Sequence, residues 1–193
     1  MDEVKRHIEE SIRVKRLLLD NEELLESIKG ASEACIKALK NGKKLMFAGN
    51  GGSAADAQHL AAELVSRFGF DRPGIAAIAL TTDTSVITAV SNDYSFDMLF
   101  SRQIESIGSK GDVFLALSTS GNSKNIIEGL KTAREKGLST IGITGSSGGK
   151  MADLCDIIIK IPSDETPRIQ EATILTGHIL CYEIENSLFG KIE

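Results

Sequence analysis

The sequence predicts an α/β protein with a five-stranded parallel sheet flanked by helices, a three-layer αβα sandwich. The first observation is a change of pattern after Lys44, where helical spacing gives way to the short apolar run Leu45 to Ala48, which ends at Gly49. Such a run is typical of a strand buried on both faces. The second observation is that similar runs then alternate with segments of helical period, which predicts βαβ units and therefore parallel strands.

The later elements follow from their apolar spacing and from the residues at their boundaries. In chain order we predict a helix over 54–67, a strand over 75–80, helices over 84–91 and 96–107, a strand over 113–117, a helix over 124–136, a strand over 140–143, a short helix over 151–154, a strand over 157–161 and a helix from 167 to about 188. Gly137 closes one of these helices. Pro167 opens the last one, because proline is favoured in the first helical turn.

The N-terminal segment lies outside this alternation and predicts two amphipathic helices. Apolar residues recur at helical spacing in the first of them: Val4, Ile8, Ile12 and Leu19. Such stripes either pack on the sandwich or build an oligomer interface, and we expect the second, because no sheet face is left for them. The prediction is one domain over 1–193, with a helical pair over 1–41 and the sandwich over 42–193.

Composition and charge exclude several classes of protein. Hydrophobic residues make up 41% and charged residues 25%, as in globular proteins. The net charge of −5 is spread along the chain, so we expect neither nucleic acid nor a membrane surface as a partner. No apolar stretch approaches the ~20 residues of a membrane span, which predicts a cytoplasmic protein. Cys35, Cys155 and Cys181 form no metal or disulfide pattern and are predicted to be buried.

Two loops at the ends of predicted strands could bind an anion. In Gly49-Asn50-Gly51-Gly52-Ser53, glycines let the backbone approach a ligand at the start of a helix, although a tight turn would look the same. In the second loop, Ser118, Thr119, Ser120 and Ser123 offer four hydroxyls before a helix. Capping that helix requires only one hydroxyl, so we favour phosphate binding. Neither loop is a Walker or dinucleotide motif.

Four polar side chains on the helices are candidates for chemistry. His59 and Glu63 are four residues apart, so both point to one face of their helix, where they form either a metal or proton-transfer pair or an ordinary surface pair. His178 follows Gln170 by eight residues, a rise of ~12 Å. For both to serve one metal site, the helix must bend or different subunits must contribute them.

Through three motifs, the sequence resembles the sugar isomerase (SIS) domain proteins, and within them the phosphoheptose isomerase family. They are Gly49-Asn50-Gly51-Gly52-Ser53-Ala54-Ala55-Asp56-Ala57-Gln58-His59, then Ser118-Thr119-Ser120-Gly121-Asn122-Ser123, then Thr166-Pro167-Arg168-Ile169-Gln170-Glu171 with His178. The resemblance covers almost the whole chain and implies a SIS, flavodoxin-like αβα fold. It also implies a cytosolic homotetramer with active sites between subunits and one zinc ion per subunit.

The same resemblance implies an isomerase that converts D-sedoheptulose 7-phosphate to D-glycero-D-manno-heptose 7-phosphate through an enediol. Glu63 would be the catalytic base and His178 the partner acid or base. The implied metal ligands are His59, Glu63, Gln170 and His178. The implied substrate-binding residues are Asn50, Gly51, Gly52, Ser53, Glu63, Asn92, Asp93, Ser118, Thr119, Ser120, Ser123 and Gln170. Two rivals are a non-catalytic SIS protein that binds a replication initiator protein and a SIS isomerase for another sugar phosphate.

Overall fold

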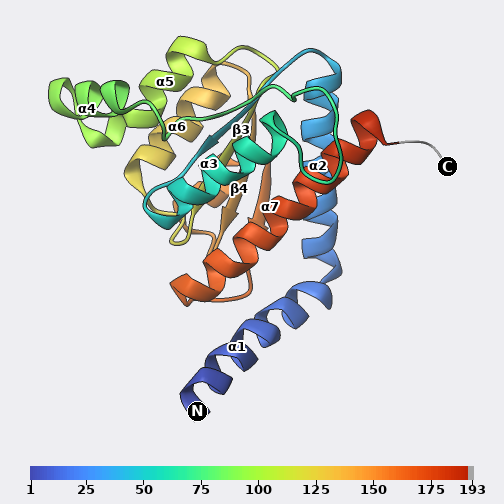
Figure 1. The fold of residues 1–193 in the computed structure, drawn as a ribbon. Coiled ribbons are helices and arrows are strands. Elements are labelled where there is room, and N and C mark those ends of the chain that lie inside the picture. Colours follow the sequence, from blue (N-terminus) through green and yellow to red (C-terminus); the bar gives the residue numbers. More distant parts are fainter. Residues whose placement is uncertain (191–193) are drawn as a thin grey trace.

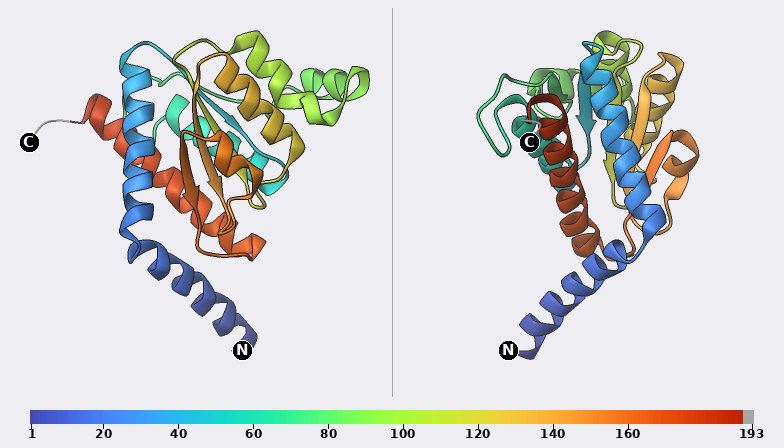
Figure 2. Two further views of the ribbon diagram at one scale, coloured as in Figure 1. Left: turned by 180° about the vertical axis from the view of Figure 1, so that it is seen from behind. Right: turned by 90° about the vertical axis from the view of Figure 1, so that its right-hand side faces the viewer.

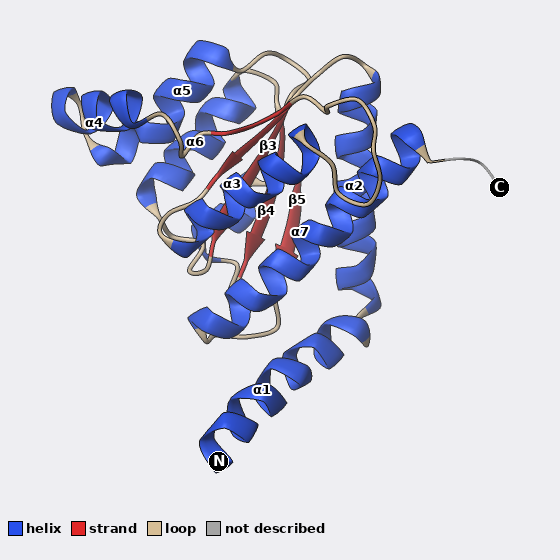
Figure 3. Cartoon of the chain, in the orientation of Figure 1, coloured by secondary structure: helices blue, strands red, loops and turns tan. Residues whose placement is uncertain are grey.

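The computed structural model describes residues 1–190 and has the predicted five-stranded parallel sheet, with strand order β2-β1-β3-β4-β5 (Figure 1). The strands are β1 (Leu45–Ala48), β2 (Ala77–Ala79), β3 (Val113–Ser118), β4 (Ser139–Thr144) and β5 (Ile157–Lys160). All four strand pairs are parallel. Because every strand points the same way, the loops that follow them meet at one edge of the sheet (Figure 3).

Helices cover both faces of the sheet and complete the three layers (Figure 3). The α-helices are α1 (Asp2–Leu19), α2 (Glu22–Lys40), α3 (Gly52–Val65), α4 (Thr84–Asp93), α5 (Leu99–Ile107), α6 (Lys124–Glu135) and α7 (Thr166–Phe189). Two 3₁₀ helices, η1 (Phe96–Met98) and η2 (Gly149–Leu154), lie between them. Within residues 1–190, no helix is long and apolar enough to cross a bilayer.

The alternation of side chains along each strand builds two separate cores. Leu45 and Phe47 of β1 pack with α2, α3 and α7 on one face. Met46 and Ala48 pack with α5, α6 and η2 on the other. The central strands are therefore apolar throughout, because both of their faces are buried. The first of these cores holds the two helices that carry the predicted histidines.

The structure corrects several predicted boundaries. The helix expected over 54–67 begins at Gly52, because the glycine loop already forms its first turn. The strand expected over 75–80 is reduced to Ala77–Ala79 at the edge of the sheet, where only one neighbour pairs with it. The single helix expected over 96–107 is divided into η1 and α5. Tightening of a helix start into a 3₁₀ turn of this kind is common.

The first helix extends away from the sandwich, as two views show (Figure 2). Only Val14 and Leu18 of α1 are buried, whereas the predicted apolar stripe is exposed: Val4, Ile8, Ile12 and Leu19. At the start of α7, the buried Arg168 donates a hydrogen bond to the backbone carbonyl of His7. This contact holds α1 beside α7 and leaves its apolar stripe facing solvent.

Two of the three cysteines are buried as predicted, namely Cys35 and Cys181. Cys155 is only half-buried, which corrects the prediction for it. Burial, strengthened by the nearby Asp156, raises the pKa of the Cys155 thiol to about 12.

An ion pair between the half-buried Lys44 and the buried Asp112 closes the edge of the sheet where the strands begin. Asp112, just before β3, accepts hydrogen bonds from the ammonium and backbone amide of Lys44 and from the amide of Ser109. Burial by itself would raise the pKa of Asp112, but these hydrogen bonds lower it below its ordinary value. A carboxyl with a lowered pKa stabilises the folded state above the ordinary carboxyl pKa, and this contribution is lost as the pH falls toward the folded-state value.

We therefore expect Asp112→Asn to lower the free energy of unfolding at pH 7 by about 1–3 kcal/mol, the cost of weakening a buried charged hydrogen bond. The difference between wild type and variant should shrink below about pH 4, where the carboxyl is protonated in the unfolded state. Urea unfolding across this pH range measures both effects. A difference that stays constant down to pH 2 would contradict the assigned charge interaction.

Candidate active site between helices α3 and α7

Helices α3 and α7 lie side by side and run in the same direction, although they are far apart in the sequence (Figure 1). Three contacts follow the same order along both segments: Gly52 with Gln170, Leu60 with Gly177, and Phe68 with Glu185. At Gly177 an added Cβ would lie 2.5 Å from the side chain of Leu60. A glycine at this position therefore permits the close approach of the two helices.

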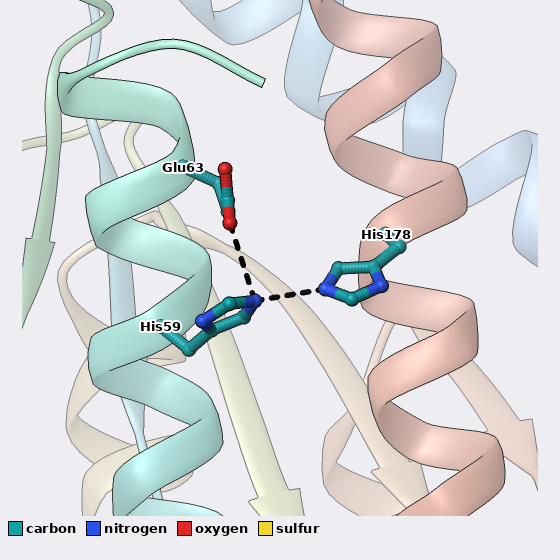
Figure 4. Close-up of side chains that lie close together, drawn as sticks. All are labelled: His59, Glu63 and His178. Carbon is teal, nitrogen blue, oxygen red and sulfur yellow. Dashed lines mark hydrogen bonds and ion pairs between the residues drawn. The ribbon is translucent and has the colours of Figure 1, made fainter. Parts of the chain in front are cut away.

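This approach brings three predicted site residues together (Figure 4). The Nε2 atom of His59 lies 2.8 Å from Nε2 of His178 and 3.3 Å from Oε1 of Glu63. His59 and Glu63 point to the same side of α3 because they are one turn apart, and His178 reaches them from α7. The side chain of His59 is 46% exposed and that of Glu63 is 24% exposed, so the cluster is open to small molecules.

The three side chains fit a single metal ion. Their candidate ligand atoms all lie within 4.8 Å of one another. Imidazole nitrogen and carboxylate oxygen are donors that catalytic zinc takes, and bonds near 2 Å in a tetrahedral site place donor atoms about 3.3 Å apart. Cys181 lies one turn after His178, but it is buried with its thiol against the backbone carbonyl of Leu60 and does not belong to this group of candidate ligands.

Gln170, the fourth predicted metal ligand, lies elsewhere in the same chain. It precedes His178 by two turns, a rise of ~12 Å, and α7 is one continuous helix between the two residues. The side-chain amide of Gln170 lies so close to Gly52 that a Cβ there would collide with it. Within one chain, Gln170 is therefore placed at the start of α3, beside the glycine loop.

The glycine loop is joined to the start of α6 by a pair of amide side chains. Asn50 donates to Oδ1 of Asn125 at 2.8 Å, and Asn125 donates back to Oδ1 of Asn50 at 2.9 Å. Asn125 is 2% exposed and was not among the predicted residues. The sequence offers only one sign of this role: Asn125 is a polar residue in the first turn of a helix, and apolar residues follow it directly.

The serine loop after β3 folds back on itself. The hydroxyl oxygens of Ser118 and Ser123 lie 3.2 Å apart, and the Ser120 hydroxyl accepts a hydrogen bond from the backbone amide of Asn122. Gly121 has a φ of +64°, and a Cβ there would collide with the carbonyl of Gly148 in the next loop. Predicted hydroxyls and helix α6 thus meet at the carboxyl edge of the sheet, as phosphate binding requires.

Two predicted substrate residues stand apart from these loops. Asn92 and Asp93 lie at the end of α4, which projects at the periphery of the fold (Figure 1). Both are exposed, and the side chain of Asn92 donates to Asp93 at 2.8 Å. Within residues 1–190, neither hydrogen-bonds to the glycine or serine loop.

A second residue missed at the sequence level is Asp56, which precedes His59 by one turn on α3. Its Oδ2 atom is buried and has no hydrogen-bond partner in the described part of the chain. Burial raises the pKa of Asp56, and the nearby His59 and His178 oppose that shift only in part. The sequence signal was available, since positions 56, 59 and 63 share one helical face.

Comparison with known proteins places this geometry in a family. The SIS domain model matches residues 12–145. Phosphoheptose isomerase 2 from Campylobacter jejuni is 59% identical to this chain, over 97% of this chain and 94% of its own length. The chain belongs to the phosphoheptose isomerase family of SIS domain proteins.

Solved structures of the phosphoheptose isomerase family confirm the fold. One from Neisseria gonorrhoeae is 44% identical, with a TM-score of 0.90, and covers 96% of this chain and 98% of that one. Another, from Francisella tularensis, is 36% identical, with a TM-score of 0.92 over 96% and 97% of the two chains. These relationships favour the isomerase over the initiator-binding protein and over an isomerase for another sugar phosphate.

We expect Gly177→Ala to separate α3 from α7, because the new methyl group would overlap the buried Leu60 side chain. Such overpacking costs about 1–3 kcal/mol and should move His178 away from His59. Urea unfolding and zinc titration by calorimetry measure the two effects. Gly30→Ala is a matched control, since a Cβ at Gly30 on α2 meets its nearest neighbour at an ordinary 3.8 Å. Unchanged zinc affinity in Gly177→Ala would contradict the role of this close approach.

Proposed function

We propose that this aldose–ketose isomerase converts D-sedoheptulose 7-phosphate to D-glycero-D-manno-heptose 7-phosphate, the first step toward nucleotide-activated heptoses. Membership in the phosphoheptose isomerase family supports the reaction class. The observation that carries the proposal is the convergence of His59, Glu63 and His178 between α3 and α7, within reach of one another. Two imidazoles and a carboxylate are groups that proton transfer beside a carbonyl requires.

The phosphate is proposed to bind at the serine loop. The protein carries a net charge of −5, so overall charge does not attract the substrate. Backbone amides at the start of α6 and the loop hydroxyls can instead donate directly to phosphate oxygens. The glycine loop, fixed by the Asn50–Asn125 pair, would contact the sugar hydroxyls.

The proton transfer runs between adjacent carbons of the open-chain sugar. Glu63 removes a proton from C1 of the ketose, and the electrons of that C–H bond form the C1–C2 double bond of an enediol. The proton is returned to C2 while the hydroxyl on C1 becomes the carbonyl of the aldose. His178 is the partner acid or base for the oxygen protons, and a positioned group of this kind contributes roughly 10²- to 10⁴-fold.

Zinc is the proposed cofactor, with one ion per subunit. His59, Glu63 and His178 would hold it, with Gln170 as a further ligand. When bound, zinc supplies Lewis-acid polarisation of the substrate oxygens. A carboxylate bound to a metal ion is a weaker base, so the two roles proposed for Glu63 compete, and variants of this residue separate them.

We expect the purified protein to form an aldoheptose phosphate from sedoheptulose 7-phosphate, with turnover lost after chelation and restored by zinc. NMR of the sugar carbons follows the reaction directly. A folded, zinc-loaded protein without turnover would overturn the proposed activity. In that case a binding role would become the better interpretation, to be pursued by a search for a protein partner.

Glu63→Gln keeps the size of the side chain but removes its basicity, so turnover should fall by at least about 10²-fold. Substrate affinity should change little, because the serine and glycine loops are untouched. Steady-state kinetics together with calorimetric titrations of the substrate and of zinc separate these effects. Normal turnover would exclude Glu63 as the base, and lost zinc binding would show it to be chiefly a ligand.

We also propose a cytoplasmic homotetramer whose active sites lie between subunits. Two observations support shared sites: the exposed apolar stripe of α1 needs a partner, and Gln170 lies two turns away from the cluster of its own chain. Assembly would place the loops and Gln170 of one copy beside the cluster of another.

Refolding two different inactive variants together tests whether the active sites are shared between subunits. Inactive Glu63→Gln and Gln170→Ala subunits, unfolded and refolded together, should recover up to about a quarter of wild-type activity, because random assembly leaves some shared sites intact. The same subunits refolded separately and then combined provide the control. No recovery in verified mixed oligomers would show that each site is built from one chain.

A further inference from the structure

Arg72 and Glu185 form an ion pair buried beneath the cluster of His59, Glu63 and His178. Arg72 Nε donates to Glu185 Oε1 at 2.9 Å, and the side chains are only 2% and 1% exposed. Both charges are thus removed from water, which is costly unless their remaining hydrogen-bonding capacity is satisfied. Their other partners are backbone groups of the segment that ends α3.

Arg72 binds the end of α3 from its C-terminal side. Its guanidinium donates to the carbonyls of Leu64 at 2.6 Å, Ser66 at 3.1 Å and Glu63 at 2.9 Å. These carbonyls are among those that a helix end leaves without partners, and a cation is favourable there. One of them is the backbone carbonyl of Glu63, so Arg72 fixes the turn that carries this carboxylate.

Glu185 binds the chain that follows α3. Its two carboxylate oxygens accept hydrogen bonds from the backbone amides of Phe68 at 2.8 Å and Gly69 at 2.6 Å. Burial by itself would raise the pKa of Glu185, but the two amides and Arg72 lower it below its ordinary value. The carboxylate therefore stays charged and holds both amides in place.

The ring of Phe68 links the ion pair to the cluster, because it lies against the ring of His178. Its centroid lies 5.5 Å from that of His178, at an angle of 45° between the rings. Glu185 also follows His178 by two turns on α7, so both side chains face α3 and the segment after it. The ion pair therefore contacts the cluster by two routes, through the backbone of Glu63 and through the ring of Phe68.

We propose that Arg72 and Glu185 are positioning residues for the isomerase site, which together set the orientation of Glu63 and His178. The inference rests on the proposed roles of those two residues. A structural ion pair alone would not need to contact both halves of the cluster. Because a small displacement of reacting groups costs rate, loosening this pair should reduce activity in a protein that is still folded.

Glu185→Gln tests the proposal, with Asp112→Asn as the matched control. Asp112 is also 1% exposed and paired with a cation, but it lies at the opposite edge of the sheet from the serine loop. We expect Glu185→Gln to lower kcat and zinc affinity by about 10- to 100-fold, as for partners that orient metal ligands. Asp112→Asn should lose stability while changing both quantities less than about twofold.

Two further measurements keep the outcome decisive. In the metal-free protein, the imidazole NMR signals of His178 should move in Glu185→Gln and stay in Asp112→Asn, because only the first releases Phe68. If Glu185→Gln does not fold, the Phe68→Leu variant tests the proposal instead, since it removes the aromatic ring but keeps the backbone amide that Glu185 binds. It should lower zinc affinity in the same direction by a smaller factor.

The possible failures are distinguishable. Wild-type protein without turnover would overturn the proposed function, while zinc affinity and NMR would still test positioning. The positioning role alone would be overturned if the wild-type protein shows turnover and Glu185→Gln does not differ from Asp112→Asn. The quantities to compare are kcat, zinc affinity and the His178 NMR signals. In the absence of a folded Glu185→Gln variant, unchanged kcat and zinc affinity in Phe68→Leu would do the same.

Discussion

The close parallel packing of α3 against α7 is the constraint on which the candidate site depends. Parallel strands all end at one edge of the sheet, so helices that pack back over the sheet from that edge, as α3 does after β1 and α7 after β5, share a direction. That shared direction keeps the contacts between α3 and α7 in register over several turns. Gly177 permits the close approach at Leu60, and His178 meets His59 as a direct result. The chemistry between these helices is therefore a consequence of how tightly one layer of the sandwich is packed.

The two ends of this helix pair are suited to different tasks. Near the start of α3, the glycine loop, the serine-loop hydroxyls and the start of α6 gather where the strands end, a setting that favours an anion without basic side chains. Farther along the two helices, imidazoles and carboxylates face one another, an arrangement that suits metal binding or proton transfer. An acidic protein can thus handle a phosphorylated sugar because local dipoles, and not net charge, supply the attraction.

Buried polar groups hold these parts in place. The Asn50–Asn125 pair joins the glycine loop to α6. The Arg72–Glu185 pair joins the end of α3 to α7. Asn125 and the side chains of Arg72 and Glu185 are buried, so the loss of a partner would leave polar atoms unpaired away from water. Such networks are expensive to break and geometrically restrictive, which suits groups that must keep a neighbouring site rigid. The apolar stripe of α1 is the contrasting case, since it is exposed in the single chain.

The sequence by itself determined the order of strands and helices, because apolar runs and helical periods depend on local side-chain spacing. It also determined the two loops and the His59–Glu63 pair, whose members are neighbours along the chain. Only the tertiary structure decided that His178 joins that pair while Gln170 of the same chain lies two turns away, since this depends on the register between two helices that are distant in sequence. It likewise decided the partners of Asn125, Arg72 and Glu185, because a buried polar residue has no periodic pattern that reveals what it will meet.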